Sequence, residues 1–260
     1  MAEEQQAGAQ DTFISHLVEL RNRLVKASAV VLAVFLVLVA VWPGPAAVYD
    51  FIARPMMIAL PGDARMIATG VITPFLVPMK VTLLAAFIVS LPWVLYQMWA
   101  FIAPGLYAHE KRLVAPLVIS SSVLFIMGVA FCYFLVFGQV FRFIYDFAPK
   151  SITVAPDIEN YLDFVMTMCL AFGVTFEVPV VVVVLVRMNL MTVEKLKEIR
   201  PYVIVGAFVV AAVVTPPDVM SQLFLAVPMC LLFELGLLLA PLFVRATKAP
   251  EENPESSSTS

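Results

Sequence analysis

The sequence predicts an all-α integral membrane protein with six transmembrane helices. Apolar residues make up 62% of the 260 residues and charged residues only 13%, whereas soluble proteins have about 45–50% and about 25%. The mean hydropathy is +0.97, and the apolar residues are concentrated in runs near the roughly 20 residues that a spanning helix needs. A water-soluble globule of this size could not bury so much apolar surface. Soluble enzymes and disordered chains are therefore disfavoured, and the net charge of −3 gives no reason to expect nucleic-acid binding.

Six apolar runs are the predicted spans. They cover about 24–42, 73–102, 113–137, 161–188, 201–214 and 219–244. The second contains Pro78 and Pro92, the fourth Pro179 and the sixth Pro228, and the third can continue as helix to Tyr145. Because a hydrogen bond lost in lipid must be replaced by a neighbouring helix, these prolines predict bent helices in a packed bundle.

The fifth run is unusually short. Its length of about 14 residues corresponds to about 21 Å of helix, against a hydrocarbon core of about 30 Å. Such a span requires a thinner bilayer around it or support from partner helices.

The distribution of Lys and Arg predicts that both termini are cytoplasmic. Eleven of these residues lie on the side of the termini, four lie in the opposite loops, and Lys80 lies within the second run. Cytoplasmic loops carry the excess of positive charge, and six spans return the chain to its starting side. The acidic start of the chain does not resemble a cleaved signal peptide.

We expect one transmembrane domain, residues 1–245, with three further segments. Residues 12–23 are amphipathic and are expected to form a helix in the interface plane before the first span. Residues 43–72 are the longest outer loop and are expected to cap the bundle. Residues 246–260 are polar and low in complexity and are expected to be disordered.

Glu177 is the strongest functional candidate from the residues alone. A carboxylate in the middle of a span costs about 2.5 kcal/mol or more, and such acids face the bundle interior or a wet cavity. The structural alternative is a protonated acid bonded to neighbouring backbone. Glu234, in the sixth run, is a second acid for which the sequence shows no partner.

Structural roles remain open for the other polar candidates. Glu19 can pair with Arg23 one helical turn later, and Glu110 can interact with the dipole at the start of a helix. Phe101 belongs to an aromatic group suited to the membrane interface. Asp218 can cap the sixth helix.

No catalytic, metal or cofactor site is predicted. Cys132, Cys169 and Cys230 each lie inside an apolar run and are typical of small buried hydrophobic residues. Two histidines, His16 and His109, leave few ligands for a metal. A nucleophile–histidine arrangement or a pair of facing aspartates is not evident either.

Five stretches together resemble the TatC subunit of the twin-arginine protein translocase. They are residues 15–23 (SHLVELRNR), 95–112 (LYQMWAFIAPGLYAHEKR), 172–179 (FGVTFEVP), 200–202 (RPY) and 215–218 (TPPD). Their order on a six-span topology makes the resemblance specific, and it covers about residues 13–244. It implies a concave, glove-like bundle with short fifth and sixth helices in the bacterial cytoplasmic (inner) membrane.

The resemblance implies a receptor and not an enzyme. Such a receptor binds the twin-arginine signal peptides of folded cargo, recruits the single-span subunits TatA and TatB, self-associates in a multi-copy complex and draws on the proton-motive force. The implied peptide-binding residues are Glu19, Arg21, Phe101 and Glu110. Carboxylates suit this task because each can accept paired hydrogen bonds from one guanidinium group.

The same resemblance assigns the remaining candidates. It places Pro55 in the outer cap, Glu177 on the concave face, and Thr215, Asp218 and Gln222 where partner helices dock. Without it, a proton-coupled small-molecule carrier that uses Glu177 is about as well supported as a receptor. The carrier predicts internal repeats and more paired intramembrane charges, and an intramembrane enzyme is the third alternative.

Overall fold

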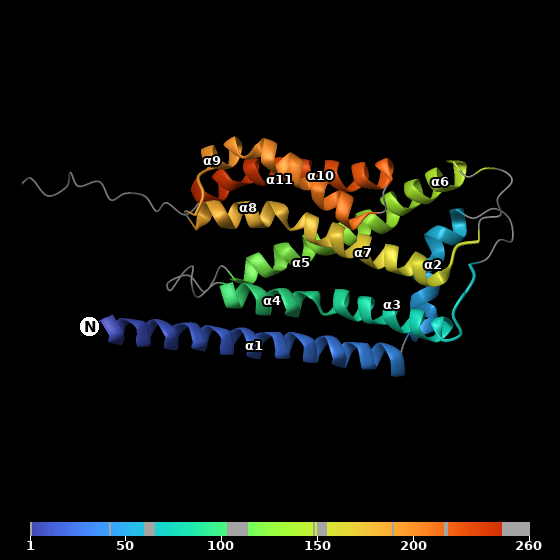
Figure 1. Ribbon diagram of the computed structural model, residues 1–260, viewed down its shortest axis with the longest axis horizontal. Helices are drawn as coiled ribbons and strands as arrows, with labels where there is room; N and C mark the ends of the chain where they lie inside the picture. The colour runs from blue at the N-terminus through green and yellow to red at the C-terminus, as the bar shows by residue number, and fades with distance from the viewer. Residues whose placement is uncertain are drawn as a thin grey trace, which may run out of the picture.

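The structure, a computed structural model, describes residues 2–41, 43–59, 66–102, 114–147, 149, 155–188, 190–215 and 218–245. Its elements are α1 (Ala2–Ala40), α2 (Pro45–Ala59), α3 (Thr73–Val89), α4 (Leu91–Ile102), α5 (Val114–Phe131), the π-helical η3 (Cys132–Val136), α6 (Phe137–Phe147), α7 (Ile158–Phe176), α8 (Val178–Arg187), α9 (Val193–Glu198), α10 (Arg200–Val214) and α11 (Val219–Arg245). The predicted all-α membrane fold is confirmed (Figure 1).

Apolar helices correspond in order to the six predicted runs. Four are long enough to span a membrane by themselves: Ile14–Ala40, Ala115–Ile144, Ile158–Arg187 and Val219–Leu242. The bent pair α3–α4 is a fifth candidate, and α10 is a shorter apolar helix of 15 residues, about 22 Å long. In Figure 1 the start of α1 and the end of α11 lie at the same end of the bundle.

The first helix is longer than the sequence suggests. Residues 12–23, which were expected to form a separate interfacial helix, continue without a break into the first span. The stretch 12–40 contains neither Pro nor Gly, so nothing in it interrupts the helical hydrogen bonds. Only 6% of the residues in the most apolar 18-residue stretch of this span are buried. α1 packs along one edge of the bundle against α3 and α4 (Figure 1).

The predicted bend of the second span lies at Pro92. Proline has no N–H to donate to the carbonyl of Ile88, four residues earlier, and its ring opposes a straight helix there. The chain accordingly turns by 57° between α3 and α4, at Ser90. The turn makes α4 a separate short helix that leads to Phe101.

The sixth helix is not short, so the short sixth helix that the family resemblance implied is wrong. α11 has 27 residues and continues through both Pro228 and Pro241. α11 packs closely against α8 at Gly236, which has no side chain to keep the two helices apart. A Cβ atom on Gly236 would lie 2.9 Å from Cβ of Val182 and 3.0 Å from Cα of Pro179.

The core is built around α7. The most apolar window of the α7–α8 span is 56% buried, and Met168 and Phe172 are completely enclosed. α5 approaches α7 closely at Gly128, where a Cβ atom would lie 2.5 Å from the Phe172 carbonyl oxygen. All three cysteines are free, and Cys132 and Cys169 belong to this core.

Candidate functional site

An aromatic pair and a carboxylate lie at the end of the bundle that contains the start of α1. The His16 ring, on α1, stacks on the Phe101 ring near the end of α4, with centroids 4.3 Å apart and an interplanar angle of 22°. Glu19 follows His16 by about one helical turn, so the fold brings Glu19 near Phe101. Glu110, the second predicted acid, lies outside the described residues.

Glu19 is engaged in the local ion pair that the sequence left open. Arg23 donates from Nη2 at 2.6 Å and from Nε at 2.9 Å, and both bonds end on Oε1 of Glu19. The pair is partly buried, and i,i+4 ion pairs on helices contribute only about 0.3–0.5 kcal/mol, so a stronger guanidinium partner can displace Arg23. Arg21 is exposed and donates to Oδ1 of Asn22 at 3.3 Å.

Glu177 occupies the break between α7 and α8. Pro179 cannot donate to the carbonyl of Thr175, so the helix is interrupted. The Glu177 N–H donates instead to the Val174 carbonyl at 3.0 Å, a tighter turn than an α-helix makes. Both carboxyl oxygens are buried, and within the described part of the chain neither has a hydrogen bond of good geometry. Glu177 therefore points into the protein.

Glu234, in contrast, has a cation as its partner. Arg200, at the start of α10, donates from Nη2 to Oε2 of Glu234 at 2.7 Å. The sequence did not indicate this pair because the two residues lie on different helices. The pair ties the start of α10 to α11.

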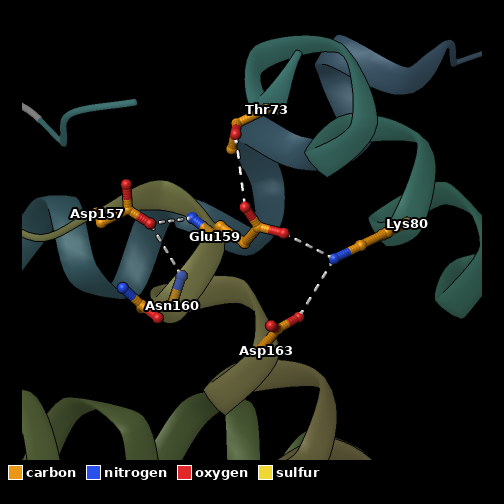
Figure 2. Close-up of polar contacts among 6 residues, drawn as sticks. All are labelled: Thr73, Lys80, Asp157, Glu159, Asn160 and Asp163. Atoms are coloured by element: carbon orange, nitrogen blue, oxygen red, sulfur yellow. Dashed lines mark hydrogen bonds and ion pairs between the residues drawn. The ribbon is translucent and has the colours of Figure 1, made fainter. Parts of the chain in front are cut away.

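Lys80, which the sequence left unassigned, joins α3 to α7 near the opposite end of the bundle. Figure 2 shows its ammonium group between two carboxylates one turn apart, at 3.1 Å from Glu159 Oε1 and 3.7 Å from Asp163 Oδ1. The Thr73 hydroxyl donates to the other oxygen of Glu159 at 3.5 Å. All three charged side chains are 40–57% exposed. We call this cluster and Asp157 the outer seam.

Asp157 connects the outer loop to the start of α7. Its Oδ1 accepts the backbone N–H groups of Glu159 and Asn160, which caps the helix (Figure 2), while Oδ2 accepts the hydroxyl of Thr69 at 2.7 Å and its N–H at 3.1 Å. The Thr69 hydroxyl, followed by the Asn160 N–H, lowers the pKa of Asp157 because these donors stabilise the carboxylate. An isolated parallel β-bridge between Ile67 and Asp157 also joins the two segments.

Pro55 lies in α2, the helical part of the predicted outer cap. Because Pro55 has no N–H, the carbonyl of Phe51 lacks its usual helical donor. The Tyr133 hydroxyl donates to this carbonyl at 2.5 Å, and its ring stacks on the Phe51 ring at 5.0 Å. Tyr161 donates to the next carbonyl, that of Ile52, at 2.9 Å. Pro55 thus leaves the Phe51 carbonyl free to accept a hydrogen bond from Tyr133, and this bond joins α2 to the bundle.

The predicted docking residues gather where α10 meets α11. Asp218 Oδ1 accepts the N–H of Ser221 at 2.7 Å, which confirms its role as a cap, and the Thr215 hydroxyl donates to its own helix at Ala211. Asp218 Oδ2 and the Ser221 hydroxyl are buried and, among the described residues, have no partner. Gln222 donates to the Phe208 carbonyl at 3.2 Å.

The bundle and these sites define a multi-spanning helical membrane protein. Among the described residues, no three His, Cys, Asp or Glu side chains form a metal-ligand group. The chain belongs to the Sec-independent protein translocase TatC family, whose sequence profile matches residues 15–228.

Relatives and solved structures agree with this assignment. The chain is 52% identical over 227 residues to the TatC of Haemophilus influenzae, covering 87% of this chain and 88% of that protein. It is 48% identical to the TatC of Escherichia coli K12 over 92% of both. The crystal structure of the twin-arginine translocase receptor TatC superposes with a TM-score of 0.75 at 34% identity, over 87% of this chain and 98% of that one. The protein is therefore a translocase component, and the carrier and enzyme alternatives are not favoured.

The role of Pro55 predicts an energetic coupling to Tyr133. Tyr133→Phe should lower the free energy of unfolding by about 1 kcal/mol, since it removes the donor to the Phe51 carbonyl. In the Pro55→Ala background the loss should be smaller, because the new N–H at position 55 can serve that carbonyl. A double-mutant cycle on detergent-solubilised protein measures the difference. Tyr161→Phe is the control, with equal losses expected in both backgrounds; an equal loss for Tyr133→Phe would contradict the role of Pro55.

The outer seam is expected to weaken in acid. The pKa of Asp157 is lower in the folded protein than in the unfolded chain, so its contribution is present above the unfolded pKa and is lost as the pH falls through the folded pKa. Amide exchange of residues 66–72, corrected for intrinsic rates, should lose protection on acidification. Asp157→Asn should lower protection at neutral pH and remove this dependence. A wild-type profile that is independent of pH would refute the assignment.

Proposed function

We propose that this chain is the signal-peptide receptor of the translocase. It binds the twin-arginine signal peptides of folded cargo through Glu19, Arg21, Phe101 and Glu110. The observation that supports this best is the stacking of the Phe101 ring on His16, which lies about one helical turn before Glu19 on α1. A solved relative is itself described as a twin-arginine translocase receptor.

The chemistry of these residues suits a peptide with two arginines. Guanidinium groups form paired, charge-assisted hydrogen bonds with carboxylates and stack on aromatic rings, whereas a lysine ammonium lacks the planar fork. Arg23 already shows the mode of contact, with Nε and Nη2 both directed at Glu19. A peptide arginine that displaces Arg23 makes the same contact, and Glu110 takes the second arginine.

The proposal includes a location in the bacterial inner membrane with both termini cytoplasmic. The excess of Lys and Arg on the side of the termini supports this orientation. The start of α1 and the end of α11 lie at the same end of the bundle, which is compatible with six crossings. The receptor also associates with further copies of itself in a complex.

Partner docking is proposed at the polar group where α10 meets α11. Gln222 is partly exposed there, and polar side chains next to lipid favour an interhelical hydrogen bond. Gln222 uses its amide nitrogen within the protein, so its carbonyl oxygen is the group that can accept from a partner. The single-span subunits TatB and TatA are the proposed partners, and Glu177 supports their contact or the proton-motive-force-driven transport that follows.

Loss of either acid should impair peptide binding. Glu19→Gln and Glu110→Gln should each weaken the affinity for a fluorescent peptide with two adjacent arginines by about 10-fold or more, because each removes a charge-assisted pair of about 1.5–3 kcal/mol. Fluorescence anisotropy with purified protein measures the affinity, and Glu194→Gln in α9 is the control with no expected change. A twin-lysine peptide should bind the wild type weakly. Unchanged affinity in both acid variants would rule out the assignment.

Docking at Gln222 can be tested by photocrosslinking in native membranes. A photoreactive amino acid at position 222 should capture a single-span helix, whereas the same group at Leu238, an exposed residue farther along α11, should not. Thr215→Val should lower the yield from position 222. Equal capture from positions 222 and 238 would show that the contact is not specific.

A further inference from the structure

A buried hydrogen bond connects the proposed peptide site to the bundle interior. Trp99 lies on α4, two residues before Phe101, and its indole N–H donates to the Ser121 hydroxyl oxygen of α5 at 3.1 Å. Trp99 is 5% exposed and Ser121 is completely buried. Solvent therefore does not compete for this bond, which gives it more weight than an exposed bond of the same length.

Ser121 differs from the serines on either side of it. The hydroxyls of Ser120 and Ser122 donate to carbonyls of their own helix, those of Leu117 and Val118, at 3.0 and 2.7 Å. In the described part of the chain Ser121 makes no such bond to its helix. A serine hydroxyl has one hydrogen to donate and two acceptor lone pairs. Since Trp99 occupies an acceptor position, the hydrogen of Ser121 remains for another group.

The acceptor proposed for this hydrogen is the Glu177 carboxyl. Gly173, one turn before Glu177, packs against the ring of Phe125, and Val118 and Val180 belong to one buried cluster with Trp99. Ser121 lies between Val118 and Phe125 on α5, so the packing places it beside the α7–α8 break. Both Glu177 oxygens are buried and, among the described residues, have no hydrogen-bond partner. Ser121 is the donor that this arrangement offers to a carboxyl group excluded from water.

We propose that Trp99 and Ser121 are the positioning residues of the Glu177 carboxyl group, and that they transmit a movement of α4 to it. The first half of the proposal rests only on these contacts. The second half rests on the proposed function, because the movement follows from peptide binding at Phe101. α4 is suited to such a movement, since the 57° turn at Ser90 separates it from α3.

The consequence is a direct physical connection between peptide recognition and the intramembrane acid. A shift of Trp99 changes the orientation of the Ser121 hydroxyl, which has a single hydrogen, and so changes whether this hydrogen is directed at Glu177. The acid thereby responds to an event at the membrane surface without contacting the peptide. Trp99 and Ser121 act through Glu177 and need no contact with the peptide themselves.

Infrared difference spectroscopy of the full-length protein in lipid vesicles tests the positioning role. The carboxyl band of Glu177 is identified as the band that Glu177→Gln removes. Ser121→Ala and Trp99→Phe should each shift this band, Ser121→Thr should restore it because it retains the hydroxyl, and Ser122→Ala should leave it unchanged. If Ser121→Ala leaves the band at its wild-type frequency, the positioning role is wrong. If Trp99→Phe does not fold, the Ser121 variants alone decide the positioning role.

A twin-arginine peptide added to the same vesicles tests the transmission. In the wild type and Ser122→Ala it should shift the Glu177 band, and in Trp99→Phe the shift should be at most half as large while peptide affinity is unchanged. The same shift in Trp99→Phe and wild type would overturn the transmission. If the peptide binds the wild type without shifting the band, transmission is again refuted and the receptor function stands. If the peptide does not bind the wild type, the proposed function fails together with the transmission, and the peptide-free spectra still decide the positioning role.

Discussion

The requirement that every backbone polar group be satisfied inside a bilayer explains most of this structure. Proline removes a donor that lipid cannot replace, and each of three prolines marks an element that the bundle uses. Pro55 exposes a carbonyl that Tyr133 binds, which anchors the outer helix. Pro92 separates α4 from α3, and Pro179 opens the break in which Glu177 lies. These three prolines thus mark the places where the chain departs from regular helix and positions polar groups.

Two groups of charged residues are paired across helices. Lys80 lies between Glu159 and Asp163, and Arg200 pairs with Glu234. These pairs join α3 to α7 and α10 to α11, so they also fix how these helices are placed relative to one another. The acid in the α7–α8 break has, among the described residues, no hydrogen-bond partner for either carboxyl oxygen. It is therefore the intramembrane acid least explained by packing alone.

In the proposed function, a structural ion pair and a recognition site are the same group. Glu19 and Arg23 form an ordinary i,i+4 pair, which keeps the carboxylate oriented. Under this proposal an incoming peptide arginine exchanges one guanidinium partner for another, so little desolvation cost is added. A lysine cannot make the same two-pronged contact, and this gives a physical basis for discrimination between the two cations.

The sequence by itself determined the class of protein, the order of the apolar helices, the shortness of α10, the bend at Pro92 and the break at Pro179, because hydropathy and the absence of a proline N–H are local properties. The bends expected at Pro78 and Pro228 are not found, since α3 and α11 continue through these residues. It also pointed to Glu177 as a buried acid. It did not reveal that α1 is continuous or that Lys80 and Glu234 have partners on other helices; the length of α11 agrees with the apolar run 219–244 and not with the short helix that the family resemblance implied. Those features depend on the rotation, depth and separation of neighbouring helices. Close contacts such as that of Gly128 with α7 set these quantities, and only the tertiary structure contains them.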